Sequence, residues 1–108
     1  MSSAQDVSLQ MIKDMRSAAN TAEAIPMAAY MKNHFPFLGL KKEKRTALSK
    51  ALLDLKFTQW KSNELQEIIL HLWQLPEREF QYVAIDLLKK HQNKLQKQDV
   101  EWIEDLIT

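Results

Sequence analysis

Apolar residues recur three or four positions apart along most of the chain, the spacing that places side chains on one face of an α-helix. The pattern predicts about six helices separated by short polar connections. The stripes that define them are Val7, Met11, Met15 and Ala18; Met27, Tyr30 and Met31; Ala47, Leu48, Ala51, Leu52 and Leu55; Leu65, Ile68, Ile69, Leu72 and Trp73; Phe80, Val83, Ala84, Leu87 and Leu88; and Val100, Ile103, Leu106 and Ile107.

Capping and helix-breaking residues predict the ends of the first three helices. Ser2 or Ser3 can cap the first helix with its hydroxyl group. Pro26 is expected in the first turn of the second helix, where a missing N–H has no cost. This helix should end by Pro36, because the residue before a proline is pushed out of the α region. The third helix is expected from about residue 42 to 56.

The remaining helices carry similar signals. Asn63 with Gln66 predicts a capping box at the start of the fourth helix. Pro76 is expected at the first position of the fifth, with the acidic side chains of Glu77 and Glu79 at the positive end of its dipole. A last, shorter helix is expected from about Asp99.

The apolar stripes repeat after about 35 residues, so that the third helix aligns with the fifth and the fourth with the last. Repeated helix pairs at this distance are typical of an α-solenoid. Two copies would also fit an ordinary helical bundle with loops of similar length. From periodicity alone both arrangements remain open.

The composition of the chain narrows the fold classes that are possible. The chain has 108 residues with one glycine and three prolines, which favours a single all-α domain over residues 1–108. It has no cysteine, which excludes disulfides, thiol catalysis and thiolate metal sites and agrees with the cytoplasmic location that we expect. The sequence contains neither a signal-peptide pattern nor the apolar run of about 20 residues that a membrane span requires. We therefore expect no membrane partner.

Charge is concentrated in one stretch, although the net charge is only +1. Between residues 32 and 50 a single acid, Glu43, stands against six bases: Lys32, Lys41, Lys42, Lys44, Arg45 and Lys50. Cations at a helix start oppose the helix dipole, a local cost that an external anion would remove. Such a patch could hold a polyanion along one face. The simpler alternative is a solvated helix start.

Three segments together resemble a known family: PMAAYMKNHFPFLGL (Pro26 to Leu40), KRTALSKALL (Lys44 to Leu53) and LWQLPEREFQ (Leu72 to Gln81). In sequence, order and separation these segments closely resemble the N-terminal part of the AlkD-type DNA glycosylases, members of the DNA alkylation repair family built of HEAT-like helical repeats. The resemblance covers nearly the whole chain from about Ala22. It implies antiparallel helix pairs stacked as a HEAT-like α-α solenoid.

The resemblance also implies a function, the hydrolysis of the N-glycosidic bond of purines alkylated at N3 or N7. It carries Tyr30 and the basic helix after Gly39 over to the DNA-binding face. We therefore predict that Tyr30, Lys41, Lys42, Lys44 and Arg45 bind double-stranded DNA, through its phosphate backbone rather than its base edges.

No catalytic residue, metal site or cofactor is predicted. The three histidines His34, His71 and His91 lie on different segments without metal-ligand spacing. In the family, the catalytic tryptophan and aspartate follow the helix that resembles DVEWIEDLIT, which would place them beyond Thr108. We therefore expect the N-terminal part of a longer solenoid that is inactive by itself.

Two alternatives remain, a non-catalytic repeat module that binds DNA and a repeat scaffold for a protein partner. We also expect a homodimer through an uncovered apolar face on the last helix, which carries Val100, Trp102 and Ile103.

Overall fold

The structure is a computed structural model that describes residues 3–55, 60, 64–95 and 97–107. Within these residues the chain forms six α-helices and one short 3-10 helix, without a strand. The elements are α1 (Ala4–Ser17), α2 (Thr21–Tyr30), α3 (Lys42–Leu53), α4 (Glu64–Gln74), α5 (Arg78–Lys90), η2 (Gln92–Lys94) and α6 (Lys97–Ile107). The all-α prediction is confirmed. No helix in the described ranges has the length and apolar character to cross a membrane.

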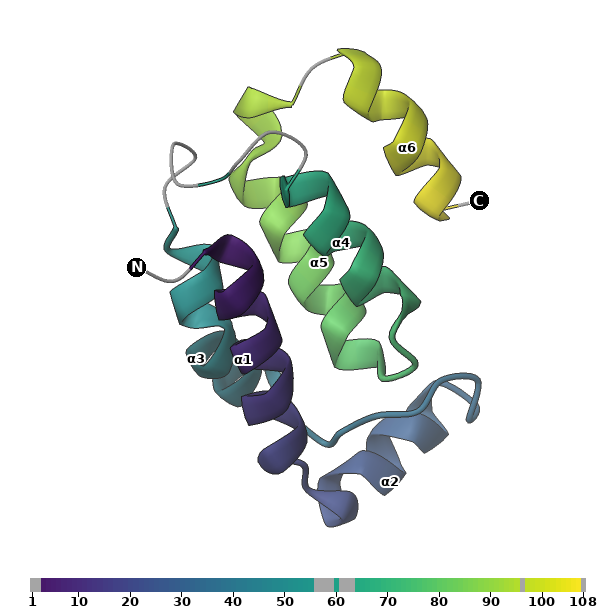
Figure 1. Cartoon of the computed structure of the whole chain (residues 1–108). Coiled ribbons are helices and arrows are strands. Elements are labelled where there is room, and N and C mark those ends of the chain that lie inside the picture. Colours follow the sequence, from purple (N-terminus) through teal and green to yellow (C-terminus); the bar gives the residue numbers. More distant parts are fainter. Residues whose placement is uncertain (1–2, 56–59, 61–63, 96, 108) are drawn as a thin grey trace.

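The helices pack as two pairs. Helix α1 packs against α3, and α4 packs against α5; contacts between α3 and α5 and between α1 and α4 join the pairs. Within each pair the two helices run antiparallel (Figure 1). Helix α2 lies at the end of the molecule where α1 finishes, and α6 stands on the side of α4 and α5 away from α1 (Figure 1). This arrangement is consistent with an all-α helical-repeat fold.

The core lies between the two pairs, and most predicted stripes reach it. The largest fully buried apolar side chains are Phe80, Met15, Leu40, Leu52, Ile69, Leu72, Leu87 and Val83. On α3 the predicted stripe is partly wrong, because Ala47 and Ala51 are exposed while Ser49 is buried. The Ser49 hydroxyl donates to the carbonyl of Arg45 at 2.8 Å. That bond satisfies its polarity inside the helix, so a serine can occupy a core position.

The start of α1 follows the prediction, whereas α2 differs. The Ser3 hydroxyl accepts the N–H of Asp6 at 3.1 Å, within a capping box. Helix α2 starts at Thr21 with Asn20 as its cap, so Pro26 lies inside the helix rather than in its first turn. It ends at Tyr30, before Pro36, because the following turn takes positive φ angles that an α-helix excludes.

Three further boundaries were only approximately predicted. Pro76 precedes the N-cap residue Glu77 and does not occupy the first position of α5. Helix α6 begins at Lys97, two residues before the predicted Asp99. Helix α3 ends at Leu53, three residues before the predicted end at residue 56. The predicted capping box at Asn63 lies outside the described residues.

His91, at the end of α5, is buried with 3% of its surface exposed. Its ring meets the Trp60 ring edge-on, with 5.6 Å between the centroids and 74° between the planes. Burial lowers the pKa of His91, and the positive charge of Lys90 lowers it further. The folded chain therefore favours the neutral imidazole.

This burial predicts that the chain is less stable in mild acid. The unfolded histidine takes up its proton near pH 6.5, whereas the folded one does so only at lower pH. The contribution of the neutral His91 to the free energy of unfolding is thus complete above about pH 6.5. It falls below that pH, by at most about 1.4 kcal/mol per pH unit for one proton. Urea unfolding at pH 7.5 and pH 5.5 should show the loss in the native chain and in His71→Gln, where an exposed histidine is removed. The loss of stability between pH 7.5 and pH 5.5 should be much smaller in His91→Gln. An undiminished loss in His91→Gln would contradict the assignment.

Candidate nucleic-acid interface

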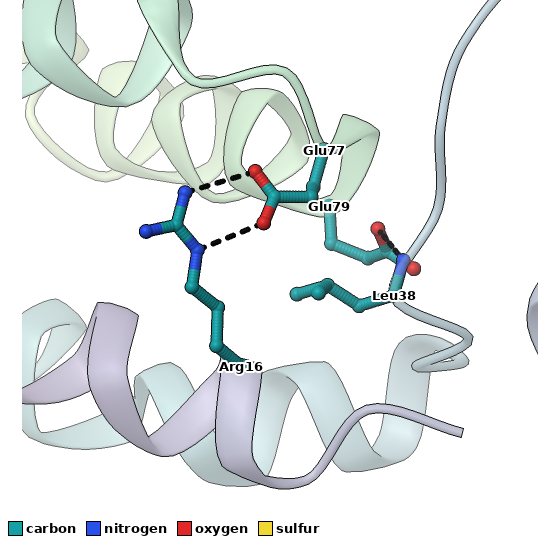
Figure 2. Close-up of polar contacts among 4 residues, drawn as sticks. All are labelled: Arg16, Leu38, Glu77 and Glu79. Carbon is teal, nitrogen blue, oxygen red and sulfur yellow. Dashed lines mark hydrogen bonds and ion pairs between the residues drawn. The ribbon is translucent and has the colours of Figure 1, made fainter. Parts of the chain in front are cut away.

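A fully buried carboxylate fixes the loop that precedes the basic helix α3. Glu79, in the first turn of α5, has 0% of its surface exposed. Its two oxygens accept three consecutive backbone N–H groups, from Leu38 at 2.9 Å, Gly39 at 3.0 Å and Leu40 at 3.1 Å. Figure 2 shows the first of these bonds. Hydrogen bonds to a charged acceptor are stronger than neutral ones, and here they compensate the burial of the charge.

The same loop is held from the other side by the junction between α1 and α2. The N–H of Asn20 donates to the carbonyl of Leu38 at 2.8 Å. Gly39 has a φ of +89°, and a Cβ atom at this position would lie 1.9 Å from the carbonyl oxygen of Asn20. Only glycine fits there without moving the backbone. The loop is therefore clamped between α5 and the start of α2.

The residue before Glu79 fixes the preceding part of this connection. The N–H of Arg78 donates to the carbonyl of Pro36 at 2.9 Å. Its guanidinium lies 4.1 Å from the centre of the Phe35 ring and 5.5 Å from that of Tyr82, and it also donates to Gln81. These are cation–π distances. The start of α5 therefore holds the chain from residue 35 to residue 40.

An ion pair ties the same end of α5 to α1. The Arg16 guanidinium donates to both oxygens of Glu77, at 2.8 and 3.0 Å (Figure 2). Hydrogen bonding by Arg16 lowers the pKa of Glu77, and the carboxylate raises the pKa of Arg16 in return. The guanidinium also lies 5.4 Å from the centre of the Phe80 ring. Three consecutive residues at the start of α5 thus each fix a different segment. Glu77 binds α1, Arg78 holds the chain at residues 35 and 36, and Glu79 holds residues 38–40.

This framework opens two neighbouring grooves. The first, of about 350 Å³, is mostly apolar and is lined by Glu23, Pro26, Met27, Tyr30, Met31, Phe37, Lys41 and Tyr82. Tyr30 is 88% exposed, and the Lys41 ammonium lies 3.1 Å from the Glu23 carboxylate. Two of the predicted DNA-binding residues, Tyr30 and Lys41, are therefore brought together.

The second groove, of about 260 Å³, lies between α3 and α5. It is lined by Arg45, Tyr82, Ile85, Asp86 and Lys89. The Arg45 guanidinium lies 4.9 Å from the centre of the Tyr82 ring. Because Tyr82 lines both grooves, it connects the predicted residue Arg45 with the Tyr30 groove.

Lys42 and Lys44, the other two predicted residues, are exposed in the first turn of α3 and line neither groove. Sequence reasoning missed Tyr82 and Lys89. Their seven-residue spacing on one predicted helix puts them on one face, and this spacing could have identified them.

The described residues contain no group of three or more histidine, aspartate or glutamate side chains that could hold a metal ion.

On α6, Trp102 is half-buried against the core and donates to Asp99 at 2.9 Å, whereas Val100 is 48% exposed. The predicted self-association stays a prediction. Val100→Glu tests it more cleanly than a change at Trp102, which packs within the chain.

Comparison with known proteins places the chain in a family. The sequence profile of the DNA alkylation repair enzymes matches residues 11–108, and the chain belongs to this family. It is similar to a solved structure described as a predicted DNA alkylation repair enzyme from Enterococcus faecalis, with 37% identity and a TM-score of 0.77. That match covers 82% of this chain but 41% of the Enterococcus faecalis protein. This chain therefore spans less than half of the length of that protein. No match was found among curated proteins.

Proposed function

We propose that this chain provides DNA-binding surface for the removal of purines alkylated at N3 or N7, by hydrolysis of their N-glycosidic bond. The observation that carries the proposal is the pair of grooves joined at Tyr82, with Lys41, Arg45 and Lys89 along them, in a chain of the DNA alkylation repair family. Cations placed in this way can bind the phosphates of a duplex. Such contacts fix the position of the protein on the DNA without reading its base sequence.

We assign no catalytic residue to this chain. A glycosidic hydrolase needs a carboxylate that is free to stabilise the positively charged sugar of the transition state. Glu23, at the first groove, is paired with Lys41. Glu77 is paired with Arg16, and the oxygens of Glu79 accept three backbone N–H groups. These three carboxylates therefore already have structural partners.

We expect the chain alone to release alkylated bases only at the spontaneous rate. The described carboxylate of the apolar Tyr30 groove, Glu23, is paired with Lys41, and Asp86 lines the second groove, which we assign to backbone phosphate rather than to a base. The measurement is chromatographic detection of free 7-methylguanine and 3-methyladenine from methylated duplex DNA, with and without the pure chain. A characterised alkylpurine glycosylase, added to the same DNA, confirms that the lesions are present. Release clearly above the protein-free sample would contradict the non-catalytic assignment.

A further inference from the structure

We propose that the groove between α3 and α5 is a phosphate-binding site formed by Arg45, Tyr82 and Lys89, and that Asp86 limits its affinity. The inference rests on the DNA binding proposed above and extends it from the basic start of α3 onto α5. It assigns a role to Tyr82, Lys89 and Asp86, which the sequence analysis did not include.

Arg45 is a partly buried cation in this groove. Its guanidinium lies 4.9 Å from the centre of the Tyr82 ring, and its buried Nε atom has no hydrogen-bond partner among the described residues. Within the part of the chain that the structure describes, no carboxylate forms an ion pair with Arg45. A partly buried cation that is not in an ion pair gains more from an external anion than a fully solvated one does. The aromatic ring holds the guanidinium in one orientation, which favours its planar binding to phosphate.

Lys89 lies at the other end of the same groove. It is seven residues after Tyr82, or two helical turns, which corresponds to about 10 Å along the helix axis. That distance is about the rise of three nucleotides along one DNA strand. Because Arg45 stacks on Tyr82, the two cations mark the two ends of the groove. We therefore expect Arg45 and Lys89 to meet two phosphates of one backbone.

The neighbouring Lys90 provides a matched comparison. It carries the same charge and is also exposed, but it is directed toward α3, where its ammonium lies 4.0 Å from the Asp54 carboxylate. It does not line the groove. Removing Lys90 changes the net charge by the same amount as removing Lys89 while leaving the proposed site intact.

Asp86 has the opposite effect on phosphate binding. It lies one turn from both Tyr82 and Lys89 and lines the same groove. A carboxylate there repels an incoming phosphate and offsets part of the attraction of the two cations. The site should therefore bind weakly in the native chain and more tightly once this charge is removed.

The test is the binding of a fluorescently labelled duplex by the full chain at several salt concentrations. Lys89→Ala should lower the slope of log affinity against log salt by about 0.9, the value for one phosphate contact. Lys90→Ala should leave the slope at the native value. Asp86→Asn should raise the affinity about two- to fivefold, as expected for one partly exposed charge. Urea unfolding of each variant confirms that the comparison is made between folded proteins.

Three results would overturn the inference. Equal changes in slope for Lys89→Ala and Lys90→Ala would mean that net charge, and not this groove, governs binding. An affinity that falls in Asp86→Asn would exclude a phosphate beside that residue. Native binding whose slope does not respond to Lys89→Ala would remove this site and leave the proposed DNA binding intact. If the native chain does not bind DNA at any salt concentration, the proposed function itself fails.

Discussion

Glu79→Gln is expected to lower the free energy of unfolding by about 3–5 kcal/mol, because buried backbone N–H groups lose a charged acceptor. The glutamine side chain keeps the shape but not the charge. Its one oxygen cannot accept all three N–H groups of residues 38–40, and its own amide nitrogen would face donors. Buried donors without an acceptor cost about 1–3 kcal/mol each. In a small domain with a total stability of about 5–15 kcal/mol, such a loss is severe.

Urea unfolding, followed by tryptophan fluorescence, measures this loss. Glu77→Gln is the matched control, since its ion pair with Arg16 is partly solvated, with side-chain exposures of 16% and 45%. We expect it to cost about 1 kcal/mol or less. Amide hydrogen exchange adds a local measurement, because Glu79→Gln should speed exchange at Leu38, Gly39 and Leu40 more than in α4. A loss below about 1 kcal/mol for Glu79→Gln would mean that the loop does not depend on this carboxylate.

How far the sequence predicts the fold depends on the length scale. The spacing of apolar residues predicted the helices and the buried stripes of α4 and α5 well, because each depends on neighbours one turn away. Ser49 shows a limit of that reasoning, since its hydroxyl is satisfied within the helix and it takes a core position. Pro26 shows another, because α2 accommodates a proline in its interior.

The contact that organises the molecule could not be predicted from local pattern. Leu38 and Glu79 lie 41 positions apart. In the sequence, Glu79 is an acid in a first helical turn, a place where a carboxylate is usually solvated and interacts with the helix dipole. Its burial depends on tertiary packing, which brings the loop with Gly39 against it. The resemblance identified both segments, FPFLGL and LPEREF, but not that they touch.

The candidate interface was predicted in part for a similar reason. A run of positive charge and the family resemblance pointed to five residues: Tyr30, Lys41, Lys42, Lys44 and Arg45. The structure places three of them, Tyr30, Lys41 and Arg45, along two connected grooves, and their binding of DNA stays a prediction. Tyr82 and Lys89 come from a helix whose charge pattern is unremarkable in sequence. They join the grooves only because α5 packs against α3.

The paired substitution Lys42→Ala with Arg45→Ala is expected to have the largest effect on DNA binding. Two cations are removed from the start of α3, where Lys42 is exposed and Arg45 stacks on Tyr82. Each phosphate contact contributes about 0.9 to the salt dependence, so the slope of log affinity against log salt should fall by about two. Because phosphate contacts carry no sequence information, unrelated duplexes should be affected alike.

Lys13→Ala with Lys97→Ala is the control for this pair. Both lysines are exposed, on α1 and α6, and neither lines a groove. The control removes the same net charge, and we expect the slope to stay at the native value. Any general effect of charge on binding would appear equally in both double variants.

The most direct measurement is therefore the affinity of the native chain and the two double variants for two unrelated labelled duplexes across a salt series. We expect similar affinities for both duplexes, a steep loss of binding as salt rises, and a slope lower by about two only in Lys42→Ala with Arg45→Ala. Absence of binding at low salt, or the same slope in all three proteins, would contradict the assignment of this surface to DNA.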